Sequence, residues 1–147
     1  MRLPYQVLAL PYRFVGGQLQ FCVFHRSNCE MWQFISGGGE DAETPSEAAR
    51  REIFEESGLQ VTQLLELKSM CYIGTDIYPQ CYRRNWPVDT YVIPEYAFGF
   101  ECGGEITLSH EHSHYAWMTL EEARQKLTWD SNKTAAYELY RRLGGEQ

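Results

Sequence analysis

The sequence predicts an α/β fold in which a mixed β-sheet is packed between helices. Segments rich in apolar and β-branched residues are interleaved with segments of helical periodicity, and their order departs from the strict β-α-β alternation of a parallel sheet. The 147 residues suit one domain, which we expect to span residues 1–147. Because 44% of the residues are hydrophobic, the chain can build a core, which excludes disorder as its main state.

The chain is expected to begin with a β-hairpin. The segments Tyr5–Arg13 and Leu19–Arg26 are apolar-rich and flank Gly16 and Gly17. Glycine readily adopts the positive φ angles that tight hairpin turns need. A third, short strand is expected at Met31–Ile35.

A glycine-rich loop and a helix follow. The run Ser-Gly-Gly-Gly at residues 36–39 predicts the loop. Thr44 is a good N-cap, Pro45 suits the first helical position, Glu47 completes a capping box, and Gly58 can end the helix in the left-handed conformation. The predicted helix therefore covers residues 45–57.

Two longer strands are expected over residues 61–73 and 90–100, joined by a loop at residues 78–89. Pro94 marks the second of them as an edge or bulged strand. A last short strand is expected around residues 115–117.

Two helices should complete the chain. Thr119 and Glu122 form a second capping box, for a helix that reaches about residue 127. Asp130 or Ser131 can cap a terminal helix that ends at Gly144. Its apolar face repeats at helical spacing and consists of Ala136, Leu139, Tyr140 and Leu143.

Charge and composition exclude several classes of protein. The 13 Lys and Arg against 20 Asp and Glu give a net charge of -7, so no basic surface for nucleic acid or anionic membrane is expected. Pro4 and Pro11 interrupt the only stretch near the start that resembles a signal-peptide core. The five cysteines include no C-x-x-C pair, which favours reduced thiols. We expect a cytoplasmic protein, either a monomer or a homodimer.

The acidic residues are concentrated in one segment. Glu52, Glu55 and Glu56 stand at i, i+3 and i+4, so their side chains can reach a common point. A divalent cation would turn their repulsion into binding, and oxygen ligands suit Mg²⁺ or Mn²⁺. Taken alone, such a triplet is more commonly a solvated helix face. Seven of the chain's 20 acidic residues lie between residues 37 and 59: Glu40, Asp41, Glu43, Glu47, Glu52, Glu55 and Glu56.

The surrounding pattern argues against a merely solvated face. Residues 37–59 follow G-x5-E-x7-R-E-U-x-E-E-x-G-U, where U is apolar, and every position is met. Seven fixed letters, each at a background frequency of about 5%, arise by chance roughly once in a billion starts. The segment resembles the Nudix box of a family of metal-dependent hydrolases that cleave nucleoside diphosphates linked to another moiety. The resemblance implies a Nudix fold, with a curved mixed sheet between helices, a loop-helix-loop motif and a C-terminal helix.

The same resemblance implies roles for individual residues. The metal ligands would be Glu52, Glu55 and Glu56, with a backbone carbonyl near Ser36 or Gly37 adding another. The cofactor would be Mg²⁺, for which Mn²⁺ can substitute.

Further catalytic roles fall to supporting residues and to a proton acceptor. Arg51 and Glu43 would orient the metal carboxylates. The proton of the attacking water would pass to Glu52 or Glu56, or to an acid from elsewhere, for which Glu111 is the best candidate. A plain surface role for Glu111 is equally compatible with the sequence.

Three histidines next to Glu111 form a separate pattern. His110, His112 and His114 alternate, so on an extended strand they would share one face and could bind zinc. A solvated or substrate-facing loop is favoured, because no further Cys or His nearby completes a tetrahedral set.

Stretches outside the box resemble the dihydroneopterin triphosphate pyrophosphatase branch of the family. They are HRSNCEMWQFISGGGE, RRNWPVDTYV and EHSHYAWMTLEEARQKLTWDSNKTAAYEL. This likeness makes Arg26 and Arg84 candidates for phosphate binding, and Trp32 and Trp86 candidates for stacking on a ring. Core or surface roles for all four remain open, above all for Trp32, which lies within an apolar strand.

The leading functional prediction is Mg²⁺-dependent hydrolysis of a phosphorylated small molecule. The substrate would be a nucleoside or pterin triphosphate, such as dATP or dihydroneopterin triphosphate, and the products its monophosphate and pyrophosphate. Two alternatives stay open: a dinucleoside polyphosphate or nucleotide-sugar hydrolase, and a nucleotide-sensing module without catalysis. The second alternative is disfavoured because such a module would be expected to lose box carboxylates, and all are intact.

Overall fold

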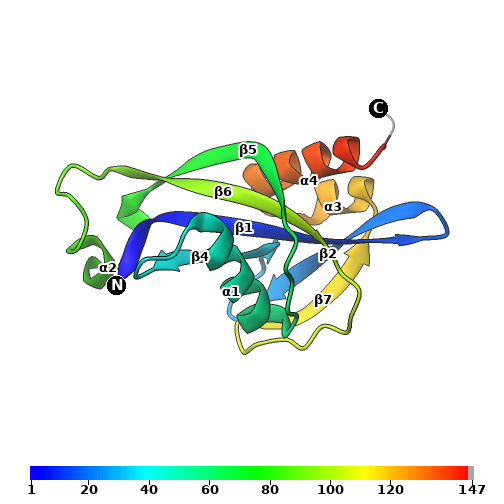
Figure 1. The fold of residues 1–147 in the computed structure, drawn as a ribbon, viewed down its shortest axis with the longest axis horizontal. Coiled ribbons are helices and arrows are strands. Elements are labelled where there is room, and N and C mark those ends of the chain that lie inside the picture. The colour runs from blue at the N-terminus through cyan, green and yellow to red at the C-terminus, as the bar shows by residue number, and fades with distance from the viewer. Residues whose placement is uncertain (146–147) are drawn as a thin grey trace.

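Seven strands of the computed structural model form one mixed sheet, and helices cover both of its faces (Figure 1). The structure describes residues 1–145, so the last two residues of the predicted domain 1–147 lie outside the described part. The strands are β1 (Arg2–Val15), β2 (Gln18–Arg26), β3 (Trp32–Gln33), β4 (Ile35–Glu40), β5 (Leu65–Gly74), β6 (Val92–Glu101) and β7 (His112–Met118). The helices are α1 (Pro45–Ser57), the 3-10 turn η1 (Thr75–Ile77), α2 (Gln80–Arg83), α3 (Leu120–Lys126) and α4 (Asp130–Arg142).

Strand β1 organises the sheet because it has three neighbours. One edge pairs in parallel with β6, which in turn pairs antiparallel with β5. The other edge is shared: the first part of β1 pairs antiparallel with β4, and its last part with β2. Strand β2 then pairs with β3 and β7. The mixture of parallel and antiparallel pairs confirms the predicted mixed sheet.

Residues of β1 alternate between the two faces of the sheet and so join two cores. Val7 and Ala9 pack toward α1, whereas Leu8 and Leu10 pack toward α3 and α4. In Figure 1, α1 lies on the near side of β1, and α3 and α4 lie together on the opposite side of the sheet. This arrangement confirms the predicted sheet between helices.

The local turn and cap signals are confirmed. Gly16 and Gly17 have φ angles of 57° and 79°, as a two-residue hairpin turn needs. Thr44 and Glu47 form the reciprocal capping box of α1, and Gly58 ends that helix at a φ of 76°. A second capping box, between Thr119 and Glu122, starts α3.

The prediction of a glycine loop at residues 36–39 is wrong, because these residues belong to β4. Side chains from other elements occupy the space that a Cβ would need at each glycine: Glu52 at Gly37, Arg2 at Gly38 and Tyr5 at Gly39. Glycines in a strand often mark such close approaches.

The single strand predicted at Met31–Ile35 is divided into β3 and β4. The break falls at Phe34, whose backbone N–H donates to Asn132 Oδ1 at 3.0 Å. A side chain from α4 therefore takes the hydrogen bond that a continuous strand would have made.

Pro94 does not place β6 at an edge, since this strand lies between β1 and β5. Pairing with β1 begins only at Glu95, so Pro94 lies just outside that ladder, and the register shift is in β5, between Glu66 and Met70. The loop predicted at residues 78–89 contains the short helix α2. It is closed by backbone bonds such as that from Arg84 N to the carbonyl of Gln80.

The predicted cap of the terminal helix is also wrong. Trp129 occupies the N-cap position of α4 and makes no side-chain cap bond, while Asp130 is already the first helical residue. Gly144 follows the helix with a φ of 93°, which confirms the predicted stop. Within residues 1–145, every helix falls short of the length and hydropathy needed to cross a bilayer.

Candidate active site

The acidic segment, which we define as residues 37–59, folds back on itself through the packing of α1 on β4 and β1. Glu52 lies where this packing is closest, and a Cβ at Gly37 would collide with its carboxylate. Only 12% of the Glu52 side chain is exposed. The glycine therefore lets a backbone strand and a carboxylate share one small space.

Arg51 holds the acidic segment together. Its Nε and Nη2 donate to the two carboxylate oxygens of Glu43, at 2.7 and 3.0 Å, in a bidentate pair. Nη1 donates to Glu52 at 2.8 Å and to Glu55 at 3.3 Å, and Nη2 also donates to the carbonyl of Gly38 at 2.8 Å. The hydrogen bonds from Arg51 hold the pKa of Glu43 below its usual value. One guanidinium thus joins the helix to the loop and to β4, as the predicted supporting role requires.

Glu56 is the most buried acid of the segment, with 2% of its side chain exposed. Its Oε2 atom has no hydrogen-bond partner among the described residues. The Oε1 atom of Glu56 lies 3.5 Å from Nδ1 of the buried His112. Neither ring nitrogen of His112 makes a hydrogen bond of ordinary geometry within the described part of the chain. Burial, followed by the neighbouring charges of Glu52 and Glu111, raises the pKa of Glu56 well above its ordinary value. A buried carboxylate in this state lacks a positive partner.

The donor set fits a hard divalent cation. Burial also raises the pKa of Glu52, although Arg51 acts against this effect, and Glu55 at the edge is half exposed. Within residues 1–145, the side chains as placed form no group of three or more His, Cys, Asp or Glu that could hold a metal ion by themselves. Mg²⁺ keeps several waters and is bound by few protein carboxylates together with substrate phosphates, so it does not need a complete protein cage. Glu52, Glu55 and Glu56 would hold the cation. The Oε2 atom of Glu56, which has no hydrogen-bond partner among the described residues, would be available to bind it.

Glu111 lies in the loop that leads into β7, where its backbone carbonyl accepts a hydrogen bond from Ser27 N at 2.9 Å. Its charge is close enough to raise the pKa of Glu56. The structure therefore brings this predicted candidate next to the acidic segment, even though it is distant in sequence.

The three alternating histidines do not share one face, as the disfavoured zinc-binding alternative would require. A register shift between β2 and β7 occurs opposite Ser113, between the pairs His25–His114 and Arg26–His112. His112 turns inward to Glu56, and His114 turns outward, where its ring stacks on His25 at 4.5 Å. His110 lies in the turn before the strand. The physical cause is the extra residue of a β-bulge, which reverses the direction of one side chain.

A cavity of about 710 Å³ begins beside the acidic segment. Ser36 lines it next to Gly37, and the predicted phosphate ligand Arg26 lines it as well. Arg26 Nε donates to Asn28 Oδ1 at 3.2 Å, which orients the guanidinium at the cavity wall. The volume lies within the usual range for sites that bind small molecules. The lining residues are Gln6, Leu8, Arg26, Asn28, Cys29, Met31, Gln33, Ser36, Cys71, Tyr72, Ile73, Ile77, Glu95, Trp129, Asp130, Ser131 and Asn132.

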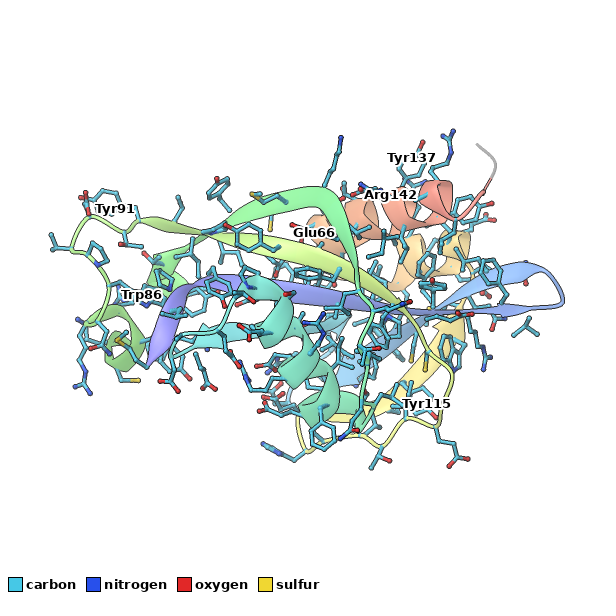
Figure 2. All side chains as sticks on the ribbon, viewed as in Figure 1. Glu66, Trp86, Tyr91, Tyr115, Tyr137 and Arg142 are labelled. Carbon is cyan, nitrogen blue, oxygen red and sulfur yellow. The ribbon has the colours of Figure 1, made fainter. Side chains whose placement is uncertain are left out.

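The other three predicted substrate ligands do not line this cavity. Trp32 packs edge-on against His25 and His114 and lies under Lys126. Trp86 is buried at the end of the molecule that carries α2 (Figure 2). There, its indole N–H donates to the carbonyl of Arg2 at 2.8 Å.

Arg84 is exposed just after α2. The structure therefore assigns Trp32 and Trp86 to packing and brings Arg26 alone of the four to the cavity.

Sequence reasoning gave no site role to most polar or aromatic lining residues, among them Gln6, Glu95, Trp129 and Asn132. A signal for Glu95 is present, since it is the single charged residue in the apolar run from Val92 to Phe100. Trp129 and Asn132 lie in the run TWDSN, whose local pattern indicates only the start of a helix. Gln6 carries no signal, because a glutamine in an edge-like strand is ordinary.

Comparison with known proteins agrees with this geometry. The family model of the NUDIX domain matches residues 5–140. A crystal structure from Listeria monocytogenes, assigned as a NUDIX hydrolase, is 43% identical, with a TM-score of 0.84 over 96% of this chain and 94% of that chain. The dihydroneopterin triphosphate pyrophosphohydrolase of E. coli is 20% identical, with a TM-score of 0.75 over 96% of this chain and 97% of that one. At that identity, the likeness shows the fold alone.

Curated relatives match at lower identity. An RNA pyrophosphohydrolase from Sulfurovum is 28% identical over 130 residues, which cover 84% of this chain and 78% of that protein. An octanoyltransferase from Myxococcus xanthus is 29% identical over 97 residues, or 65% of this chain, but the match spans only 25% of that protein. The match of the family model to most of the chain, and the acidic segment at its centre, give one conclusion: the chain belongs to the Nudix hydrolase family.

Proposed function

We propose that this Nudix hydrolase cleaves a nucleoside or pterin triphosphate into its monophosphate and pyrophosphate, with Mg²⁺ as its cofactor. The observation that carries the proposal is that the cavity is lined by Ser36, the residue immediately before the acidic segment, and that the next residue, Gly37, lies against the Glu52 carboxylate. A ligand in the cavity would therefore reach the carboxylates with one of its ends.

The charges along the cavity favour a phosphorylated small molecule. Of its described lining residues, Arg26 alone carries a positive charge, and it can bind phosphate oxygens with two parallel hydrogen bonds. Apolar surface from Tyr72, Ile73 and Ile77 lines another part of the cavity and suits a ring. The net charge of -7 disfavours a long RNA, whose phosphates would need a basic track.

The residues divide the proposed chemistry among them. A divalent cation, when bound, would neutralise charge developing on the phosphates and lower the pKa of the attacking water. Glu52, Glu55 and Glu56 hold it, and Arg51 fixes the position of Glu52. A segment carboxylate or Glu111 accepts the proton of the water.

The similar proteins bear names with different substrates: dihydroneopterin triphosphate pyrophosphohydrolase, RNA pyrophosphohydrolase and Ap4A hydrolase. The choice of a triphosphate therefore rests on the cavity rather than on these names. The cavity of about 710 Å³ would admit a pterin ring with its short side chain, or a nucleoside.

The test is a substrate panel. Purified protein with Mg²⁺ is incubated with dihydroneopterin triphosphate, the common NTPs and dNTPs, diadenosine polyphosphates and ADP-ribose, and the products are identified by mass. We expect pyrophosphate and a monophosphate from the pterin compound or from a dNTP. Cleavage confined to the dinucleotides or ADP-ribose would contradict the proposal, and binding without turnover would point to a sensing module.

A further inference from the structure

Glu95 is a buried carboxylate inside the cavity that the proposed chemistry does not use. Only 6% of the residue is exposed, and it lies on β6 beside Gln6 of β1. It is remote from the acidic segment in sequence, and none of its hydrogen bonds involves that segment. A buried acid on a cavity wall needs a reason, because burial of a charge is costly unless it gains partners.

Donors hold this carboxylate in one orientation. Gln6 Nε2 donates to Oε2 at 3.1 Å, and the thiol of Cys71 donates to Oε1 at 3.4 Å. The hydroxyl of Tyr78 in turn donates to Gln6 Oε1 at 2.6 Å, which fixes the amide so that its NH₂ faces Glu95. Burial raises the pKa of Glu95, while the neighbouring Cys71 thiol, Gln6 amide and Ser131 hydroxyl favour its charged form.

This carboxylate keeps unused acceptor capacity. An ionised carboxylate offers about four acceptor positions, and these two donors occupy one on each oxygen. Both oxygens can therefore accept a further hydrogen bond from a ligand in the cavity. A ligand group that matches them must present two donors side by side and no acceptor.

Phosphate is excluded from this position because its charge would repel Glu95. The positive Arg26, which belongs to β2, and Ser36, next to the acidic segment, mark the phosphate end instead. The ring of the substrate is thus the part that faces Glu95.

The geometry points to a specific ring edge: we propose that Glu95 recognises the adjacent N–H and NH₂ donors of a 2-amino-4-oxo ring, the group shared by guanine and pterins. This inference rests on the proposed function, since it assumes that the cavity holds the ring of a triphosphate. Adenine presents an amino donor beside an acceptor nitrogen on the corresponding edge, so one of its two positions would repel the carboxylate. The chain should prefer 2-amino-4-oxo substrates over dATP.

The experiment compares Glu95→Gln with wild type on dihydroneopterin triphosphate, dGTP and dATP. The amide keeps the shape of the side chain but replaces one acceptor by a donor, which matches adenine and opposes guanine. We expect kcat/KM for the two 2-amino-4-oxo substrates to fall about 10- to 100-fold, mainly through KM, the range for hydrogen bonds to a charged group. We expect kcat/KM for dATP to stay within about threefold or to rise.

Asp130→Asn is the matched control, because Asp130 lines the same cavity but its side chain is fully exposed. It makes the same change of charge and should leave the ratios of kcat/KM among the three substrates unaltered. Tyr78→Phe removes the hydroxyl that orients Gln6. It should lower kcat/KM for 2-amino-4-oxo substrates, but by less than Glu95→Gln does. Equal losses on all three substrates, or the same shift in Asp130→Asn, would overturn the proposal.

A binding measurement separates this inference from the proposed function. Calorimetry with dGMP and dAMP in the absence of metal should show selective loss of dGMP affinity in Glu95→Gln. If wild type hydrolyses none of the triphosphates but still prefers dGMP through Glu95, the proposed function fails and the ring assignment stands. Hydrolysis with no preference between dGMP and dAMP in wild type refutes the ring assignment alone.

Discussion

The acidic segment and the cavity beside it are built in opposite ways. The acidic segment is one continuous stretch, residues 37–59, and its central contacts join residues within that stretch, such as Arg51 with Glu43. The cavity takes its walls from residues as distant in sequence as Gln6, Cys71 and Asn132. Chemistry that every member of a family must perform can be written in one local segment, whereas a shape for one ligand needs the whole fold.

The two regions also treat buried charge differently. Glu56 has a carboxylate oxygen without a partner in the described chain, while each oxygen of Glu95 accepts a hydrogen bond from a protein donor. The unpartnered oxygen of Glu56 suits a cation, whereas the fixed orientation of Glu95 suits a ligand that presents hydrogen-bond donors. Changes in the acidic segment should therefore lower kcat, and changes around the cavity should alter KM.

Glu56→Gln should give the largest effect, because it removes the charge of the most buried ligand while keeping its shape. We expect turnover to fall by about two orders of magnitude or more, since the metal loses a ligand and its attacking water. The melting temperature should not fall, because an unpaired buried charge is removed. Glu66→Gln, which changes an exposed acid of β5 outside the acidic segment, is the control and should keep wild-type turnover. Unchanged turnover in Glu56→Gln would refute the metal role.

Arg51→Lys should give the next largest effect. Lysine cannot form the bidentate pair with Glu43 while also reaching Glu52 and the Gly38 carbonyl. Turnover should fall about 10- to 100-fold, and the free energy of unfolding should fall by about 1–3 kcal/mol. Arg50→Lys is the matched control on the same helix, because Arg50 donates only to the Thr62 carbonyl. Equal effects from the two variants in kinetics and urea unfolding would contradict the assigned role of Arg51.

Gly37→Ala tests the close approach of β4 to α1. The new Cβ would collide with the Glu52 carboxylate, so this ligand must move. We expect turnover to fall about 10-fold with a smaller loss of stability, since a carboxylate can shift more easily than backbone. Gly103→Ala meets no atom within 4 Å and should behave as wild type. Full activity of Gly37→Ala, with Glu52 displaced in its crystal structure, would show that the position of Glu52 is not critical.

Glu138→Gln should give the smallest effect, on stability alone, because Glu138 lies outside both the acidic segment and the lining of the cavity. Burial raises the pKa of Glu138, but hydrogen bonds from Lys68 N and from Ser69, with the charge of Arg142, outweigh it and lower the pKa. A lowered pKa means that Glu138 stabilises the fold above its unfolded pKa, and that this contribution is lost as the pH falls through its folded pKa.

The measurement is the free energy of unfolding of Glu138→Gln and wild type from pH 7 down to pH 3. We expect a difference of about 1–2 kcal/mol at pH 7 that shrinks toward acid, with kcat and KM unchanged. Glu121→Gln, an exposed glutamate at the start of α3, is the control. A difference that grows toward acid would contradict a lowered pKa of Glu138 in the folded protein.

Structure that depends on residues close together in the sequence could be predicted, and structure that depends on contacts between distant residues could not. Thr44, Glu47 and Gly58 fixed both ends of α1 because caps depend on residues within a few positions. The strand at Gly37–Gly39 was missed, since its pairing with β1 and its contacts with Arg2, Tyr5 and Glu52 do not appear in local composition.

The candidate site divides in the same way. The acidic segment was found by spacing alone, and the structure brings Arg51, Glu52 and Glu43 together as expected. His112 was assigned to a surface pattern because a bulge at Ser113 cannot be inferred from alternation. Trp32 and Trp86 were expected at the substrate, but an aromatic residue in a sequence gives no indication of whether its ring faces a cavity or a core.

Two neighbouring residues of β1 connect the proposed ring-binding residue, Glu95, to the acidic segment through one strand. Gln6 pairs with Glu95 on one side of this strand, and Val7 pairs with Gly37 on the other. Consecutive strand residues are separated by about 3.3 Å, and ladders on both edges hold them rigidly. The span from the ring to the cleaved bond is therefore a fixed length. The anhydride between the α- and β-phosphates, whose cleavage releases pyrophosphate, lies at the same distance from the ring in a diphosphate and in a triphosphate, so the fixed span would select which bond is cleaved without any moving lid.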